Sequence, residues 1–164
     1  MSLSDKTVVV IGGGITGASA ALDLARAGVR VELVEKDDFI GGHAAKLACK
    51  AVEDCQSCNV CLAEPRLREL LRHPLVNLRP RSQVRQVTPQ GSSFTLNIEE
   101  RPAYIGPDSC TGCGLCLEQC PEEGALRKPL LPDDTPRLAV DPKHCLFFSD
   151  QQSTLCRDVC PEEA

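Results

Sequence analysis

Eleven cysteines in a chain of 164 residues constrain the possible folds more than any other feature of the sequence. A secreted, disulfide-stapled domain usually has an even number of cysteines and a signal peptide. Here the number is odd, and Met1–Thr7 is polar and leads directly into an apolar run typical of a strand. The thiols also form runs with two residues between neighbours, a spacing that reduced cysteines use to bind metal. The sequence therefore predicts a cytoplasmic metal-binding protein.

The overall composition argues against two further classes of protein. No apolar run approaches the ~20 residues that a membrane-spanning helix needs. The net charge is −5, which argues against a nucleic-acid partner. This charge is uneven, because residues 108–164 hold five basic and eleven acidic side chains, whereas residues 1–107 carry a charge of +1. An acidic face is usually just solvated, but on an electron carrier it can also guide docking to a basic partner.

The first 48 residues have the pattern of a βαβ unit. Val8–Ile11 is a continuous apolar run, as expected for a buried parallel strand. The segment Ile15–Ala27 is rich in Ala and Leu at helical spacing, and Gly28 after it is a helix-ending signal. Val29–Val34 is a second β-branched run. Because crossovers between parallel strands are right-handed, these elements predict a Rossmann-like α/β fold with a parallel sheet.

A glycine-rich turn between the first strand and the helix fits the dinucleotide-binding pattern G-x-G-x-x-G. An acidic residue ends the second strand, 18 residues after the last glycine of this pattern. The three glycines allow a tight turn, close approach of a pyrophosphate and close helix–strand contact, respectively. The helix N-terminus would receive phosphate, and the carboxylate would accept ribose hydroxyl groups. The predicted binding residues are Gly12, Gly13, Gly14, Ile15, Thr16, Gly17, Glu35 and Lys36.

A second glycine pair follows this acidic residue after a short loop. The order resembles that of flavoproteins with two dinucleotide-binding domains, in which the loop continues past the ADP towards the flavin. This resemblance favours FAD over NAD, and it adds Gly41, Gly42 and His43 to the predicted cofactor-binding residues. The alternative interpretation is a glycine-rich turn that binds no ligand.

A first cysteine cluster comes next, in the pattern C-x5-C-x2-C-x2-C. Four thiols within thirteen residues favour an iron–sulfur site over inert, buried thiols. The candidate ligands are Cys49, Cys55, Cys58 and Cys61. Cys49 lies outside the tight run, and His43 is the alternative to it.

The segment after this cluster combines a predicted helix with predicted strands. Pro65 opens a helix over Arg66–Arg72, which His73-Pro74 ends. The predicted strands cover Val76–Leu78, Gln83–Val87 and Ser93–Ile98. Pro89-Gln90-Gly91 is the predicted turn between the last two strands.

A second cysteine cluster matches the bacterial two-cluster ferredoxin run C-x2-C-x2-C-x3-C-P. Its thiols are Cys110, Cys113, Cys116 and Cys120. Three thiols at successive two-residue spacing fit an iron–sulfur cube better than zinc, which usually takes two separate C-x2-C pairs. Cys156 and Cys160, followed by Pro161, repeat the end of the run. Residues 108–164 are therefore predicted to be a ferredoxin-like domain with two clusters.

The repeated run lacks one cysteine, because Ser153 stands three residues before Cys156. In such runs the fourth cysteine serves the other cluster. Crossed ligation then gives the first cluster Cys110, Cys113, Cys116 and Cys160, and the second cluster Cys120, Cys145 and Cys156. The second cluster is [3Fe-4S], or [4Fe-4S] with a fourth ligand that is not a cysteine, or absent. The candidates for that ligand are Ser153, Asp150, His144 and water.

The order of these motifs resembles that of the HdrA family, the iron–sulfur flavoproteins of heterodisulfide reductase. The stretch from Gly41 to Pro65 carries the resemblance, together with the glycine-rich start and the ferredoxin run. It implies a [4Fe-4S] cluster beside a flavin. Members of that family continue well beyond the ferredoxin module, into residues that complete the flavin domain. We therefore expect residues 1–107 to form a partial FAD-binding domain. Either a partner chain completes the site, or the flavin binds at a subunit interface, or the site has degenerated; the intact glycines and Glu35 favour a retained site.

The resemblance also implies a function. It points to an electron-transfer subunit of a multi-subunit anaerobic oxidoreductase, passing electrons between FAD and [4Fe-4S] clusters in a complex of the heterodisulfide reductase, quinone-linked or benzoyl-CoA reductase type. The sequence shows no recognisable nucleophile arrangement, so no catalytic residue is predicted. The alternatives are a polyferredoxin-like adaptor with an empty nucleotide fold and a stand-alone NAD(P)H-dependent reductase.

Overall fold

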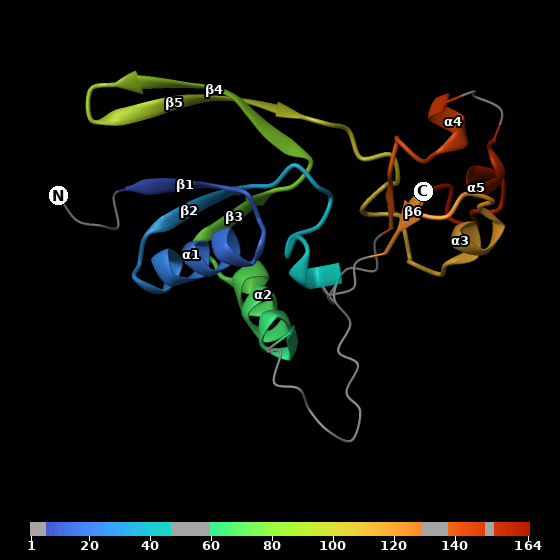
Figure 1. The fold of residues 1–164 in the computed structure, drawn as a ribbon, viewed down its shortest axis with the longest axis horizontal. Helices are drawn as coiled ribbons and strands as arrows, with labels where there is room; N and C mark the ends of the chain where they lie inside the picture. The colour runs from blue at the N-terminus through green and yellow to red at the C-terminus, as the bar shows by residue number, and fades with distance from the viewer. Residues whose placement is uncertain (1–5, 47–59, 129–137, 150–152) are drawn as a thin grey trace. The chain divides into compact units, whose positions relative to one another are not determined.

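The chain folds as two compact units, Met1–Arg101 and Pro102–Ala164. The structure is a computed structural model that describes residues 6–46, 60–128, 138–149 and 153–164 (Figure 1).

A parallel sheet forms the centre of the first unit. Its strands are β1 (Thr7–Ile11), β2 (Arg30–Val34) and β3 (Val76–Arg79), in the order β1-β2-β3. Leu33 lies opposite both Val10 and Leu78 in the register of the sheet. The prediction of a parallel α/β sheet from the two β-branched runs is therefore confirmed.

Two helices cover one side of this sheet (Figure 1). They are α1 (Ile15–Arg26) and α2 (Ala63–Arg72), and they contact one another. The buried face of α1 repeats at the helical spacing of three and four residues, and the sheet and α2 add larger side chains to the same core. The core side chains are Ala18, Ala21, Leu22, Ala25, Val31, Leu33, Val34, Leu67 and Leu70.

Helix α2 begins three residues earlier than the sequence predicts. It starts at Ala63, so that Pro65 lies inside the first turn instead of before the helix. The N–H groups of a first turn have no partner within the helix, and a proline there breaks no helical hydrogen bond. Helix α1 matches its prediction to within one residue, and Gly28 adopts a φ of +85° at its C-terminal end.

A β-hairpin follows the sheet, formed by β4 (Ser82–Gln90) and β5 (Ser93–Glu100). The predicted turn at Pro89-Gln90-Gly91 is wrong, because the turn is Gly91-Ser92 and Pro89 pairs with Phe94 inside the hairpin. Both strands of a two-stranded sheet are edges, where the missing N–H of a proline is tolerated. Gly91 supplies the positive φ, +61°, that the tight turn needs.

The second unit consists of short elements, in keeping with its weak sequence periodicity. They are α3 (Leu115–Gln119), β6 (Leu126–Arg127), β7 (Ala139–Val140), α4 (Leu146–Ser149) and α5 (Leu155–Asp158). β6 and β7 pair antiparallel, and α3 contacts α5. The buried apolar side chains are Ala125, Leu126, Leu138, Ala139 and Val140. Among the described residues this core is small. The stability of the unit therefore also depends on what fills the neighbouring cavity, which cysteines line.

Candidate cofactor sites

The glycine-rich loop joins the end of β1 to the start of α1. Gly12 has a φ of +98°, and its N–H donates to Val34 O at 2.8 Å, which fixes the loop to the end of β2. The first helical hydrogen bond runs from Ala18 N–H to Gly14 O at 2.8 Å. The N–H groups of Ile15, Thr16 and Gly17 precede this bond and lie at the positive end of the helix dipole. The loop therefore has the geometry of a phosphate-binding helix start.

Two glycines of this loop are required by close contacts. A Cβ on Gly17 would lie 1.9 Å from Gly12 O, so only glycine allows α1 to begin this near the loop. A Cβ on Gly13 would lie 2.9 Å from Ile40 Cγ2 and 3.1 Å from Glu35 Oε2. By contrast, a Cβ on Gly14 would meet nothing within 4 Å, which leaves open space at the position predicted to face the pyrophosphate.

Glu35 lies directly beneath this loop and is only 6% exposed. Its Oε2 accepts a hydrogen bond from Gly13 N–H at 2.5 Å, and its Oε1 accepts one from Asp37 N–H at 2.8 Å. A carboxylate has about four acceptor positions, so both oxygens keep capacity for ribose hydroxyl groups. The carboxylate therefore holds two loops together in addition to the role that the sequence predicts for it.

The second glycine pair packs against the first loop. Gly41 N–H donates to Gly13 O at 2.7 Å, and Gly41 forms a parallel bridge with Gly14. Gly41 and Gly42 have φ values of +103° and +55°, which other residues rarely adopt. The structure thus brings together the predicted residues of both loops. Lys36 and His43 are exposed beside them.

The first cysteine cluster falls mainly outside the described residues. Cys49, Cys55 and Cys58 belong to residues 47–59, which the structure does not describe. Cys61 is exposed in a short 3₁₀ turn, Val60–Leu62, immediately before α2. The cluster therefore belongs to the crossover between β2 and β3.

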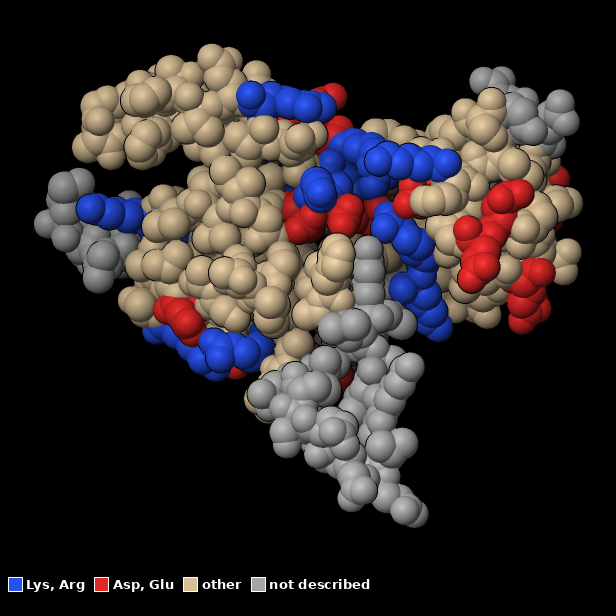
Figure 2. All heavy atoms as spheres, viewed as in Figure 1, with Lys and Arg blue, Asp and Glu red and all other residues tan. Residues whose placement is uncertain are grey.

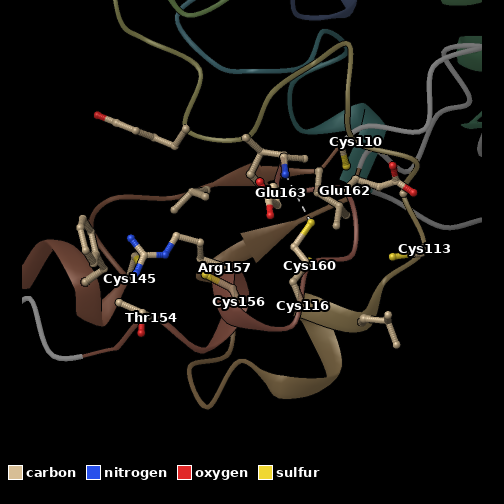
Figure 3. Close-up of a pocket in the computed structure, with 18 of the residues that line it drawn as sticks. Cys110, Cys113, Cys116, Cys145, Thr154, Cys156, Arg157, Cys160, Glu162 and Glu163 are labelled. Atoms are coloured by element: carbon tan, nitrogen blue, oxygen red, sulfur yellow. Dashed lines mark hydrogen bonds between the residues drawn. The ribbon is translucent and has the colours of Figure 1, made fainter.

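In the ferredoxin unit, a cavity of about 310 Å³ collects six cysteines (Figure 3). They are Cys110, Cys113, Cys116, Cys145, Cys156 and Cys160. In the view of Figure 3, Cys110 and Cys113 lie towards one end and Cys145 towards the other, with Cys116, Cys156 and Cys160 between them. Thiols from the two halves of the ferredoxin motif, far apart in sequence, thus share one space.

A second, smaller cavity of about 20 Å³ shares Cys145 and Cys156 with the first. It is also lined by Cys120 and Ser153. The three cysteines that the sequence assigns to the second cluster thus line one cavity together with Ser153, one of the candidates for the fourth ligand. The other two protein candidates for the fourth ligand are not found at this cavity. His144 lines neither cavity, and Asp150 lies outside the described residues.

Burial and neighbouring thiols affect the protonation of two of these cysteines. Burial raises the pKa of the Cys156 thiol, and the charges of Cys145 and Cys120 raise it further. Burial likewise raises the pKa of Cys116, with smaller contributions in the same direction from Cys110 and Cys156. The two thiols thus favour the protonated form unless positive charge is bound beside them, and iron ions supply such charge.

The donor set fits iron–sulfur clusters. Within the described residues, no three His, Cys, Asp or Glu side chains converge closely enough to bind one metal ion together. In a [4Fe-4S] cluster each thiolate binds a different iron, so the four sulfurs need not converge on one point. Two thiols already have backbone contacts: Cys160 Sγ accepts from Ala164 N–H and Cys120 Sγ donates to Glu122 O, each at 3.5 Å.

Three aromatic side chains beside the large cavity were not predicted as part of the site. Tyr104 and Phe148 have ring centroids 4.6 Å apart, and Phe147 and Phe148 are 5.4 Å apart. All three line the cavity and remain partly exposed. The chain has only five aromatic residues, so the Phe147-Phe148 pair was the available sequence signal.

The chain combines a glycine loop of the dinucleotide-binding type with a ferredoxin unit whose cysteines share cavities. This combination is typical of iron–sulfur flavoproteins. Comparison with protein families agrees: residues 7–97 match the family described as FAD dependent oxidoreductase, and residues 109–164 match the 4Fe-4S dicluster domain. The chain belongs to the FAD-dependent oxidoreductase family, and it carries a domain for two [4Fe-4S] clusters.

Individual relatives narrow the family assignment further. The chain is 34% identical over 173 residues to the HdrA protein of the ferredoxin:CoB-CoM heterodisulfide reductase of Methanosarcina acetivorans, covering 97% of this chain and 22% of that protein. It is 39% identical over 123 residues to an iron-sulfur HdrA protein of the CoB–CoM heterodisulfide reductase of Methanopyrus kandleri, covering 75% of this chain and 18% of that protein. The chain is thus a homologue of the HdrA proteins, as the sequence motifs predict. It spans about a fifth of the length of these relatives.

Among solved structures, the L-proline dehydrogenase from P. horikoshii aligns with 58% of this chain and 20% of its own. The TM-score is 0.43 and the sequence identity is 24%. In the part of the chain that the structure describes, every helix is too short or too polar to cross a membrane.

Proposed function

We propose that this chain is an electron-transfer subunit of a multi-subunit anaerobic oxidoreductase of the HdrA type. The observation that carries the proposal is the union of a glycine loop for FAD with two sets of ferredoxin cysteines that meet at shared cavities. When bound, FAD exchanges electron pairs and the iron–sulfur clusters exchange single electrons, so together they convert one kind of transfer into the other. The domains of the proposal are residues 1–107 for FAD and residues 108–164 for the ferredoxin clusters.

The first unit would bind the ADP half of FAD. The N–H groups at the start of α1 would face the pyrophosphate, and the open space at Gly14 allows its approach. Glu35 would accept the ribose hydroxyl groups, and its negative charge disfavours a 2′-phosphate. Gly41-Gly42, packed on the first loop, would continue the site towards the flavin. Lys36 and His43 stay candidate contacts at its exposed rim.

The second unit would bind two clusters by crossed ligation. Cys110, Cys113, Cys116 and Cys160 would hold the first cluster, and Cys120, Cys145 and Cys156 the second. The small cavity supports this division, because it contains the three thiols of the second set and none of the first. The N–H of Ala164 near Cys160 would stabilise negative charge on the first cluster.

A third cluster would occupy Cys49, Cys55, Cys58 and Cys61 in the crossover between β2 and β3. The described residues at both ends of this segment support the assignment, because the 3₁₀ turn Ala44–Lys46 contacts α2, which directly follows Cys61. A chain segment whose two ends lie near each other can bring its first and last cysteines to one site.

The proposal includes a cytoplasmic location and partner subunits. The loops of the first unit that we assign to FAD are those predicted to meet its ADP half. One partner subunit would enclose the flavin ring, and another would exchange electrons with the ferredoxin unit.

The test is to isolate the complex without oxygen through a tag on this chain and to quantify FAD, iron and sulfide per chain. We expect stoichiometric FAD and about twelve irons for three cubes, against about eight if only the ferredoxin unit is loaded. Cys58→Ala should remove about four irons and leave the ferredoxin clusters, and Cys113→Ala should affect the ferredoxin unit instead. A complex that holds the clusters but no FAD would replace this proposal with the adaptor function.

A further inference from the structure

The second ferredoxin cluster has three cysteines, and the small cavity shows what else can reach it. Cys120, Cys145 and Cys156 line this cavity, and the rest of its lining is apolar except for Ser153 and Glu122. The side chain of Glu122 is exposed, whereas Ser153 is half-buried and lines the large cavity as well. Cys145 and Cys156 also border the large cavity, so a cube held by these two cysteines and Cys120 would have one iron without a thiolate and the Ser153 hydroxyl beside it.

We propose that Ser153 Oγ is the fourth protein ligand of this cluster, so that the site holds a [4Fe-4S] cube with one oxygen ligand. The inference rests on the proposed two-cluster function. Ser153 precedes Cys156 by three residues, the same separation as between Cys113 and Cys116 in the first run. On binding, the hydroxyl proton is released to solvent and an Fe–O bond forms, as deprotonation accompanies thiolate ligation elsewhere.

The described chain neighbour of Ser153 is Thr154, whose hydroxyl is engaged in another interaction. Thr154 Oγ1 donates to Asp158 Oδ2 at 2.7 Å and begins α5, so its hydroxyl is directed to the helix. Among the described residues, the Ser153 hydroxyl forms no hydrogen bond that would compete with a metal. Ser153 is therefore the available oxygen donor of this pair.

Of the other protein candidates, His144 is the one within the described residues, and its side chain points away from both cavities. His144 Nδ1 lies 3.5 Å from Asp141 Oδ2, and the His144 side chain is 60% exposed and outside both cavities. Phe148 follows Cys145 by three residues, where the two-residue spacing of the first run would put a cysteine. Its ring instead packs against Tyr104 at a tilt and against Phe147 edge to face, and it can supply no ligand. The missing thiolate is thus not replaced on the Cys145 side of the loop.

An oxygen ligand has a definite electronic consequence. Alkoxide is a harder donor than thiolate and stabilises the more oxidised, harder iron. The second cluster should therefore have a lower reduction potential than the same cluster with four thiolates. Ser153→Cys should raise this potential while leaving the iron content unchanged.

The test compares three variants of the full chain in the complex isolated without oxygen. Ser153→Ala removes the proposed ligand, Ser153→Cys replaces it with a thiolate, and Ser149→Ala removes an exposed serine of α4 outside both cavities as the matched control. Iron and sulfide content, redox titration and the electron paramagnetic resonance spectrum of the oxidised protein are recorded for each. We expect Ser153→Ala to lose about one iron per chain and to gain the signal of an oxidised [3Fe-4S] cluster.

The outcomes distinguish a failure of the Ser153 assignment from a failure of the proposed two-cluster function. Unchanged iron content and potentials in both Ser153 variants, as in Ser149→Ala, overturn the assignment of Ser153, as does a wild-type second cluster that is already [3Fe-4S]. Wild-type protein that holds only one cluster in the ferredoxin unit overturns the proposed function itself. If Ser153→Ala fails to fold, the potential shift in Ser153→Cys decides the question alone.

Discussion

At the scale of single residues, two glycines of the same loop have different tasks. Gly17 is needed for folding, because a methyl group there would overlap the carbonyl oxygen of Gly12. Gly14 has a φ of −64° and free space around the position of a Cβ, so folding does not require a glycine there. The pattern G-x-G-x-x-G does not distinguish a glycine needed for folding from one needed for binding. The contacts around each glycine do.

Replacing Gly17 with Ala should destabilise the first unit. Inside a helix the change from Gly to Ala usually stabilises by about 1 kcal/mol. Here the 1.9 Å approach to Gly12 O forces the backbone to move, and we expect a net loss of about 1–3 kcal/mol. Urea unfolding followed by circular dichroism measures this, and a variant as stable as wild type would contradict the contact.

Replacing Gly14 with Ala should leave folding intact and weaken FAD binding. The added methyl group occupies the open space where the proposed pyrophosphate would approach the backbone. We expect the unfolding free energy to stay within about 0.5 kcal/mol of wild type and the affinity for FAD to fall at least about tenfold. Fluorescence titration with FAD measures the affinity, and unaltered binding would place the phosphates elsewhere.

Glu35 provides the third residue prediction, because both of its oxygens accept backbone N–H groups. In Glu35→Gln the amide nitrogen would face one of these donors, so one hydrogen bond is lost and a buried N–H is left unsatisfied. We expect a loss of about 1–3 kcal/mol in urea unfolding. Glu32→Gln, in β2 just before Glu35, is the control, because in the described part of the chain Glu32 accepts from the side chains of Asn77 and Arg79 instead of from backbone N–H groups. Equal effects in the two variants would contradict the bridging role of Glu35.

At the scale of elements, α1 and α2 are joined by an exposed ion pair above their apolar contact. Arg26 Nε and NH2 donate to Glu69 Oε1 and Oε2 at 2.8 and 2.6 Å. This hydrogen bonding lowers the pKa of Glu69 and raises that of Arg26. Pairs this exposed contribute little, so the apolar side chains between the helices remain the main source of their association.

The lowered pKa of Glu69 gives a pH-dependent prediction with a definite sign. Above the unfolded-state pKa the carboxylate is ionised in both states and the pair contributes fully. As the pH falls through the lower folded-state pKa, Glu69 takes up a proton and the contribution is lost. The stability difference between wild type and Glu69→Gln should therefore be small at neutral pH and vanish in acid.

Thermal unfolding at several pH values measures this difference. Glu64→Gln is the control, because the ion pair of Glu64 with Arg68 lies within α2 and does not join the two helices. A difference that grows on acidification would contradict the assignment.

Local patterns predicted the elements better than they predicted the cavities. β1, α1 and β2 follow from apolar periodicity and from Gly28, because each signal acts within a few residues. The start of α2 and the hairpin turn were missed at prolines, whose lost N–H costs little in a first turn or at a sheet edge. Cys120 and Cys156 line the same cavity although 36 residues separate them. Hydrophobic periodicity does not encode such a long-range approach, and only the ferredoxin motif indicates it.

At the scale of the whole molecule, charge and cofactor sites are distributed unequally between the two units. Residues 108–164 hold eleven acidic and five basic side chains, and Figure 2 shows acidic side chains on the visible face of the ferredoxin unit. Glu162 and Glu163 belong to this set, and both line the large cysteine cavity. Negative charge beside a redox centre attracts cationic partners and repels anionic ones, and salt screens both effects.

This charge predicts how the reduced clusters react with small oxidants. At low ionic strength, a cationic oxidant such as hexaammineruthenium(III) should oxidise the ferredoxin clusters faster than expected from its driving force, and ferricyanide should be slower. The double variant Glu162→Gln/Glu163→Gln should lower the ratio of the two rates by roughly two- to fivefold, because two charges at the cavity are removed. Stopped-flow absorbance at two salt concentrations measures both rates.

Glu99→Gln, an exposed change on β5 in the first unit, is the control and should leave the ratio almost unchanged. A ratio that is independent of salt in wild type would mean that the acidic face only solvates the unit, and that a basic partner gains nothing from it.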